Sequence, residues 1–216
     1  IETLEETDDL FDGMEPGYFY SRDGNPTTDA LAQAVARLEG AEDGIACSSG
    51  MGATLTALLS ATEPGKRIVA ARDLYGKSAT LLQTLFAPLG ADISFVDSGD
   101  VSAWESALAT PAKVVFLETI TNPLLRVPDL PTISAMAKQA GATLIVDNTF
   151  ATPYHLRPLE LGADLVVHSA TKYLGGHNDV TAGVVVGDAD RLLAGRAHAS
   201  TMGVNLSPFE AWLTLR

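Results

Sequence analysis

The chain has 216 residues, 46% of them hydrophobic, and a formal net charge of −13. This length allows one large domain or a domain and a half, the mean hydropathy of +0.15 is that of a globular protein, and no apolar run approaches the roughly 20 residues of a membrane helix. The acidic balance argues against a nucleic-acid partner, because such a surface needs basic side chains to neutralise phosphates.

The single cysteine, Cys47, excludes an internal disulfide and favours a reducing compartment, so we expect a cytoplasmic protein. Residues 1–17 hold seven carboxylates and no basic side chain, which predicts a solvated or mobile loop. The chain starts at Ile1 rather than at methionine and stops at Arg216 inside an amphipathic pattern. We therefore expect it to be part of a longer polypeptide.

Short apolar runs predict strands, and amphipathic stretches between them predict helices. The predicted strands are residues 44–48, 67–71, 91–97, 113–118, 143–146, 165–167 and 183–186. The predicted helices are residues 28–39, about 50–61, 78–86, 134–140 and 208–216, and a further helix starts at residues 102–105. The helix at 28–39 has Thr28 as its expected N-cap and Gly40 as its stop, and the helix at 102–105 opens with a capping box. Near-continuous apolar strands joined by helices favour an α/β fold with a mostly parallel sheet, in which ligands bind beyond the carboxyl ends of the strands.

Small residues from Ser48 to Ala53 join a predicted strand to a predicted helix. Such a turn exposes main-chain N–H groups and the positive end of the helix dipole, so it is either an anion site or an ordinary tight turn. A dinucleotide fingerprint fails here because Leu55 takes the place of the third glycine. A Walker A loop ending at Lys77 fails because Ala71 takes the place of its first glycine.

Other polar residues follow the predicted strands. Tyr75 follows the strand at 67–71, where a tyrosine packs more often than it reacts. Asn122 begins an Asn-Pro turn. Asp147 directly follows a buried strand, where a carboxylate is costly unless a cation lies near. Lys172 follows the strand at 165–167 between two hydroxyl residues, Ser169 and Thr171, whose spacing lets them hold an anion while the lysine reaches inward.

Ser169-Ala170-Thr171-Lys172-Tyr173 with Gly176-His177 resembles the cofactor-lysine segment of the Cys/Met-metabolism family of pyridoxal-phosphate (PLP) enzymes. Tyr20-Ser21-Arg22 with Asn25-Pro26-Thr27, Glu118 to Pro123, and Val146 to Phe150 match further segments of that family in its order, from about Tyr18 to Arg216. The family includes cystathionine synthases and lyases, methionine γ-lyase and homoserine sulfhydrylases. The resemblance implies the PLP-dependent transferase fold of type I, with a seven-stranded, mostly parallel sheet in the large domain.

The resemblance also implies roles. Lys172 would hold the cofactor and move protons, Asp147 would pair with the ring nitrogen, and Tyr75 would stack on the ring; these are the expected catalytic residues. The expected cofactor contacts are Tyr20, Arg22, Gly50, Met51, Tyr75, Asn122, Asp147, Ser169, Thr171 and Lys172. Tyr20 and Arg22 would reach the cofactor phosphate of a neighbouring subunit, so we expect a homodimer or homotetramer. Gly76-Lys77 departs from the Gly-Gly or Gly-Cys pair of many relatives, so their substrate preference does not carry over.

The implied activity is β- or γ-elimination, or γ-replacement, on sulfur amino acids or activated homoserine. The alternatives are another type I PLP enzyme, such as an aminotransferase, and a truncated, non-catalytic PLP-binding protein. The expected division is an inter-subunit segment at 1–27, a PLP-binding domain at 28–205, and at 206–216 a helix leading to a further domain. No metal is expected, because the histidines, His155, His168, His177 and His198, show no ligand spacing; His168 is expected to be a buried packing residue.

Overall fold

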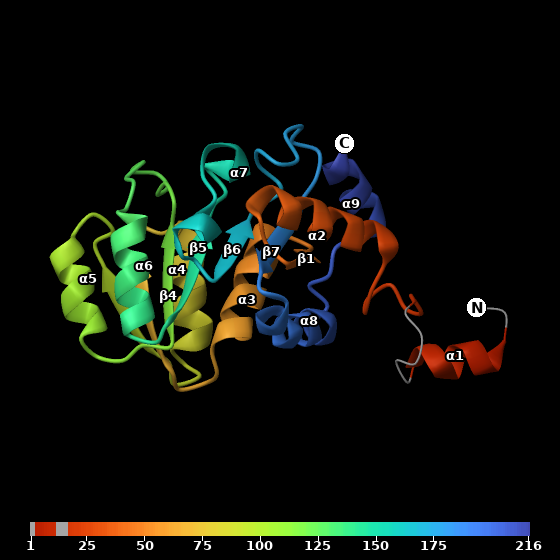
Figure 1. Cartoon of the computed structure of the whole chain (residues 1–216), viewed down its shortest axis with the longest axis horizontal. Helices are drawn as coiled ribbons and strands as arrows, with labels where there is room; N and C mark the ends of the chain where they lie inside the picture. The colour runs from red at the N-terminus through yellow and green to blue at the C-terminus, as the bar shows by residue number, and fades with distance from the viewer. Residues whose placement is uncertain (1–2, 12–16) are drawn as a thin grey trace.

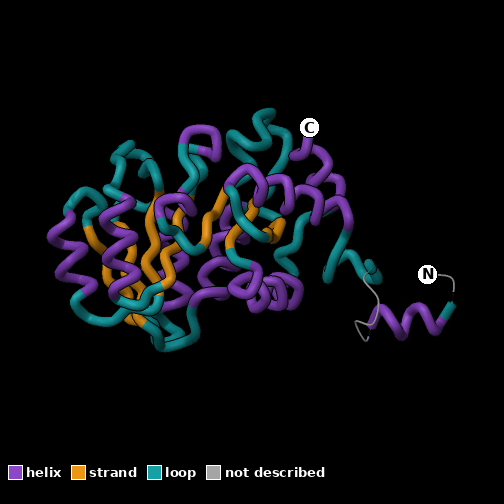
Figure 2. The backbone as a smooth tube through the Cα atoms, viewed as in Figure 1, coloured by secondary structure: helices purple, strands orange, loops and turns teal. Residues whose placement is uncertain are grey.

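The computed structural model describes residues 3–11 and 17–216, and they form a sheet with helices on both faces (Figures 1 and 2). The sheet has seven strands in the order β1-β7-β6-β5-β4-β2-β3. The strands are β1 (Asp43–Cys47), β2 (Arg67–Ala71), β3 (Asp92–Val96), β4 (Val114–Glu118), β5 (Thr143–Asp147), β6 (Leu165–His168) and β7 (Gly183–Gly187). The predicted strands are all confirmed, with each bound shifted by at most one residue.

The direction of the strands brings the functional residues together. β7 is antiparallel to both of its neighbours, β1 and β6, while the other neighbouring pairs are parallel. Every strand except β7 therefore points the same way, so the residues that follow those strands and the residues that precede β7 share one edge of the sheet. Ligand sites of parallel α/β sheets lie at this carboxyl edge.

Two helical layers cover the sheet. One layer contains α2 (Pro26–Glu39), α5 (Val101–Leu108), α6 (Leu130–Gln139) and α7 (Thr152–His155), with α9 (Pro208–Leu215) packed on α2. The other contains α3 (Gly50–Ala61), α4 (Gly76–Leu81) and α8 (Ala189–Met202). A π-helical turn (Leu82–Phe86) extends α4, and a 3₁₀ turn (Pro158–Leu161) precedes β6. In the described part of the chain, no helix is both long and apolar enough to cross a membrane.

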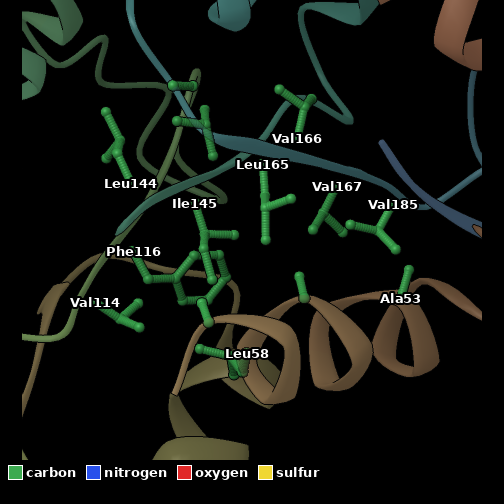
Figure 3. Close-up of a cluster of buried hydrophobic side chains, with 14 of the residues drawn as sticks. Ala53, Leu58, Val114, Phe116, Leu144, Ile145, Leu165, Val166, Val167 and Val185 are labelled. Carbon is green, nitrogen blue, oxygen red and sulfur yellow. The ribbon is translucent and has the colours of Figure 1, made fainter. Parts of the chain in front are cut away.

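The core lies between the central strands and α3. Figure 3 shows Phe116, Ile145 and Leu165 pointing from the sheet toward α3, where they face small and apolar side chains such as Ala53 and Leu58. All of these side chains are buried. Burial stabilises each large side chain by about 1.5–3 kcal/mol, and the alanine on the helix lets α3 approach the sheet closely. The carboxyl edge above this core is thus a rigid platform.

The segment at residues 1–17 differs from the predicted loop, because Leu4–Phe11 forms the helix α1. Its sequence combines residues of good helix propensity with acidic residues near the helix N-terminus, where they complement the dipole. Charge density alone therefore did not distinguish a helix from a loop in this segment. The parts of this prediction at residues 1–2 and 12–16 lie outside the described residues.

Two predicted helix starts are wrong. Asn25, rather than Thr28, caps α2 and accepts a hydrogen bond from the Thr27 amide at 3.0 Å. Asp100, rather than a capping box at 102–105, caps α5 by accepting from the Ala103 amide at 3.0 Å. In both cases the upstream residue is extended, so its side-chain oxygen reaches the free amides of the first turn. The stop of α2 at Gly40 is confirmed, with a left-handed φ of 76°.

Candidate active site

A cavity of about 300 Å³ opens at the carboxyl edge of the sheet. All the candidate cofactor residues except Tyr20 and Arg22 line it. The lining residues are Ser49, Gly50, Met51, Thr54, Tyr75, Ser78, Glu118, Ile120, Asn122, Asp147, Thr149, Phe150, Ser169, Thr171, Lys172 and Thr181. They come from the ends of β1, β2, β4, β5 and β6 and from the start of β7, so the strand directions explain why residues so distant in the chain meet.

The N-terminus of α3 forms one wall of the cavity. Ser49 caps the helix, and its hydroxyl accepts from the Gly52 amide at 3.0 Å. The amides of Gly50 and Met51 precede the first intrahelical hydrogen bond, so they are free to bind an anion together with the helix dipole. A Cβ added at Gly50 would lie 2.6 Å from the Cβ of Ser169. Glycine is therefore what lets the start of α3 lie against the end of β6.

The two hydroxyl residues beside Lys172 have different hydrogen-bond partners. The Thr171 hydroxyl donates to the Ala182 carbonyl at 3.1 Å and accepts from the Ala182 amide at 3.0 Å. The Ser169 amide donates to the Thr149 hydroxyl at 2.8 Å, and its own hydroxyl has no hydrogen-bond partner among the described residues. The expected pair of anion-binding hydroxyls is thus unequal, because Thr171 already ties the lysine turn to the start of β7.

Asp147 ends β5, and its carboxyl group lines the cavity. Burial raises the pKa of Asp147, although hydrogen bonds from the hydroxyl and amide of Thr149 and the charge of His168 lower it in part. The Thr149 amide donates to Asp147 Oδ1 at 2.9 Å. No lysine or arginine of the described chain forms an ion pair with Asp147, so its charged form would be stabilised by a cationic ligand in the cavity.

Lys172 lies on the turn after β6 and lines the same cavity as Asp147. Its amide donates to the Ser169 carbonyl at 3.1 Å, which closes the turn, and the Gly175 amide donates to the Ala170 carbonyl at 2.8 Å. The side chain is exposed, and within the described residues its amine has no ion-pair partner. The amine is therefore available for chemistry in the cavity.

The aromatic residue Tyr75 and the amide residue Asn122 complete the lining of the cavity. Tyr75 is 45% exposed and lines the cavity, so its ring has a face available to a ligand. Asn122 also lines the cavity, and its amide N–H donates to Glu118 Oε2 at 3.2 Å. The cavity thus brings together the free amides of α3, the partly buried carboxyl group of Asp147, the amine of Lys172 and the ring of Tyr75.

Tyr20 and Arg22 lie outside this cavity. The Arg22 guanidinium is 5.0 Å from the centre of the Tyr20 ring, and its Nη1 donates to the Ser200 carbonyl on α8 at 3.2 Å. The structure does not bring these two residues to the site of their own chain. Their expected contact with the cofactor phosphate of a neighbouring subunit stays a prediction.

Two acidic residues near the site were missed as functional candidates. Glu118 lines the cavity, and burial together with the nearby Asp147 raises its pKa to about 8. Glu39 lies in α2, fully buried, with its Oε1 2.6 Å from His168 Nε2 and 2.7 Å from Asn148 Nδ2. His168 is thus buried as expected, but it takes part in a polar network. A glutamate ending an all-apolar strand was the available signal for Glu118.

No group of histidine, cysteine, aspartate and glutamate side chains in the described ranges has the arrangement of a metal site. The seven-stranded, mostly parallel sheet and the cavity at its carboxyl edge define the class: an α/β protein with a small-molecule site beyond the carboxyl ends of its strands.

Comparison with known proteins agrees. A sequence model of the Cys/Met metabolism PLP-dependent enzymes matches residues 3–216. The chain is 43% identical over 209 residues to the L-methionine gamma-lyase of Pseudomonas putida, covering 95% of this chain and 52% of that protein. It is 45% identical over 207 residues to the cystathionine gamma-lyase of Bacillus subtilis (strain 168), and this match covers 94% of this chain and 54% of that protein. It therefore belongs to the Cys/Met metabolism family of PLP-dependent enzymes.

A solved structure shows the same likeness in three dimensions. Cystathionine gamma synthase from Xanthomonas oryzae pv. oryzae, in complex with aminoacrylate and cysteine, superposes with a TM-score of 0.91 at 42% identity. The match covers 94% of this chain and 53% of that one. The chain thus spans about half the length of the curated relatives it matches.

Proposed function

We propose that this chain carries the cofactor site of a PLP-dependent lyase or transferase that catalyses β- or γ-elimination, or γ-replacement, on sulfur amino acids or activated homoserine. One observation carries the proposal: Lys172, Asp147 and the N-terminus of α3 line the same cavity. Two of the relatives are a methionine gamma-lyase and a cystathionine gamma-lyase, which supports the same class of substrate.

The residues present fit the cofactor. PLP offers a phosphate, a protonated ring nitrogen, an aldehyde and a flat aromatic ring. The free amides at Gly50 and Met51, where an added Cβ at Gly50 would meet Ser169, suit the phosphate. The carboxyl group of Asp147, which has no lysine or arginine partner among the described residues, suits a cationic ring nitrogen. Lys172 supplies an amine, and the exposed face of Tyr75 suits the ring. The volume of about 300 Å³ lies at the lower end of the usual range for small-molecule sites.

When bound, PLP supplies an electron sink for charge that develops on the substrate. Lys172 would hold the cofactor aldehyde and, once the substrate amine replaces it, remove a proton from Cα and return one to the substrate. Asp147 would keep the ring nitrogen protonated, since each charge relieves the burial cost of the other. Gly50, Met51 and Ser169 would orient the phosphate, with Thr171 holding their wall in place.

The remaining contacts concern orientation and assembly. Asn122 would contact the cofactor hydroxyl or the substrate. We further propose that residues 28–205 form the PLP-binding domain, that 1–27 reach a neighbouring subunit through Tyr20 and Arg22, and that 206–216 begin the helix leading to a further domain. Arginine suits a phosphate because its forked donors bind it bidentately. The working protein would then be a cytoplasmic homodimer or homotetramer.

The full-length protein tests the proposal. PLP added to it should give a visible absorbance band that is lost or shifted in Lys172→Ala. The matched control is Lys138→Ala, an exposed lysine of α6, which should leave the band unchanged. Assays with cystathionine, methionine, homocysteine and acyl-homoserines would then identify the substrate. A Lys172→Ala protein with the wild-type spectrum would refute the assignment.

A further inference from the structure

Glu118 ends β4 and lies opposite Asp147 in the parallel register of β4 and β5. The residue is only 5% exposed and lines the cavity. Its partners are two main-chain amides: Glu118 Oε1 accepts from the Tyr75 amide, and Oε2 accepts from the Asn122 amide at 3.2 Å. No described lysine or arginine forms an ion pair with it. One carboxyl group therefore joins two separate turns of the site.

Each of these turns carries a residue that faces the cavity. Tyr75 is the N-cap residue of α4, but its side chain makes no capping hydrogen bond, so the turn lacks the usual side-chain cap. Glu118 accepts from the amide of Tyr75 itself, 43 positions away in the chain. On the other side, Asn122 follows β4 by four positions. The carboxyl group of Glu118 thus fixes the backbone from which both side chains project.

We propose that Glu118 is a positioning residue that holds the turns of Tyr75 and Asn122 in fixed places around the cavity, beside Asp147. This inference rests on the proposed function of the cavity as a PLP site. The two N–H donors meet one carboxyl oxygen each, whereas glutamine would offer one oxygen and one NH₂ group in these two places. A glutamine would turn an NH₂ group toward one of the amides and leave a buried donor unpaired.

The chemistry of the position supports a functional reason for the carboxyl group. Burial and the neighbouring Asp147 raise the pKa of Glu118 to about 8, while the two amides lower it in part. A buried acidic group beside a second one is costly for the fold, and such groups gather at functional sites. An apolar residue would fill the end of β4 at lower cost but would release both turns.

The test compares Glu118→Gln with Glu105→Gln in the full-length protein. Glu105 is an exposed residue of α5 and serves as the matched control. The loss of one hydrogen bond to the carboxyl group predicts a PLP dissociation constant raised by roughly tenfold, measured from the visible absorbance. At saturating PLP, the visible circular dichroism of the bound cofactor should also change, because the ring loses its fixed neighbours. Glu105→Gln should match the wild type in both.

A second comparison isolates the turn of Tyr75. The effect of Tyr75→Ala on PLP affinity should be smaller in the Glu118→Gln background than in the wild type, because residues that act together are not additive. If Glu118→Gln does not fold, Glu118→Asp takes its place in the same measurements of affinity and circular dichroism. Its shortened carboxylate can still be charged but cannot reach both amides, so it should show the same changes in affinity and circular dichroism.

The outcomes separate the two proposals. Wild-type affinity and circular dichroism in the Glu118 variants, or full additivity with Tyr75→Ala, would overturn the role of Glu118. That result leaves the proposed function in place if the visible band still depends on Lys172. A band that does not depend on Lys172 refutes the proposed function instead.

Discussion

Gly50→Ala should separate α3 from the end of β6 and weaken both the fold and the anion cradle. An added Cβ would lie 2.6 Å, 2.7 Å and 2.9 Å from the Cβ, Oγ and Cα of Ser169. Because two of these atoms are fixed by the backbone, no rotamer change relieves the contact. Overpacking of this kind costs about 1–3 kcal/mol. For a chain of this size each kcal/mol lowers Tm by about 2–4 °C, which predicts a loss of roughly 2–12 °C.

Gly76→Ala is the matched control. Gly76 also opens a helix at this edge of the sheet, α4, yet a Cβ there would meet nothing within 4 Å. Alanine should therefore be neutral or stabilise by about 0.4–1 kcal/mol through the unfolded state. Thermal unfolding of both variants without cofactor measures the change in stability. Titrations with inorganic phosphate and with PLP measure the change in anion binding. Equal Tm values and equal affinities for the two variants would refute the close packing of α3 on Ser169.

Three further predictions concern the buried acids. Asp147→Asn should still bind PLP but lose at least about 100-fold in kcat, because an amide does not stabilise a protonated ring nitrogen; a kcat within tenfold of wild type contradicts that role. The raised pKa of Glu118, about 8 against an ordinary value of 4.5, means that the folded state holds its proton more tightly, so its contribution to stability is present in acid and is lost as pH rises toward 8. Urea unfolding without cofactor should thus show that stability declines less from about pH 5 to 8 in Glu118→Gln than in the wild type. An equal decline in the two proteins would contradict the raised pKa of Glu118. His168→Leu should cost about 3 kcal/mol in the same assay, since it leaves the buried Glu39 carboxyl group with only the side-chain amide of Asn148 as a partner, and a cost below 1 kcal/mol would show that the contact is dispensable.

The sheet was predictable because its signal is local. Runs such as Val114 to Leu117 are apolar at every position, as expected for strands covered on both faces, and the glycine stop of α2 depends on one residue. Helix starts were harder, because Asn25 and Asp100 act from outside the amphipathic pattern that reveals the helix. The short helix α1 lies in an acidic segment whose charge favoured a loop.

The site was only partly predictable for a related reason. The ordered segments of the family pointed to the residues around the cavity, but the hydrogen bonds among them are set by the three-dimensional fold. The contact between Glu39 and His168 spans 129 positions, and nothing in the neighbourhood of either residue marks the other. The hydroxyl of Thr171 likewise looked available until its two hydrogen bonds to Ala182 were seen.

The reversed direction of β7 has a consequence for how this protein can vary. The segment between β6 and β7 leaves the sheet and returns to it at the same edge, and Thr171 fastens its two ends together at Ala182. Lys172 stands next to that fastening point, on the anchored side of the excursion. Insertions or deletions among residues 177–179, which lie between the two fastened ends, should therefore leave the position of the amine unchanged.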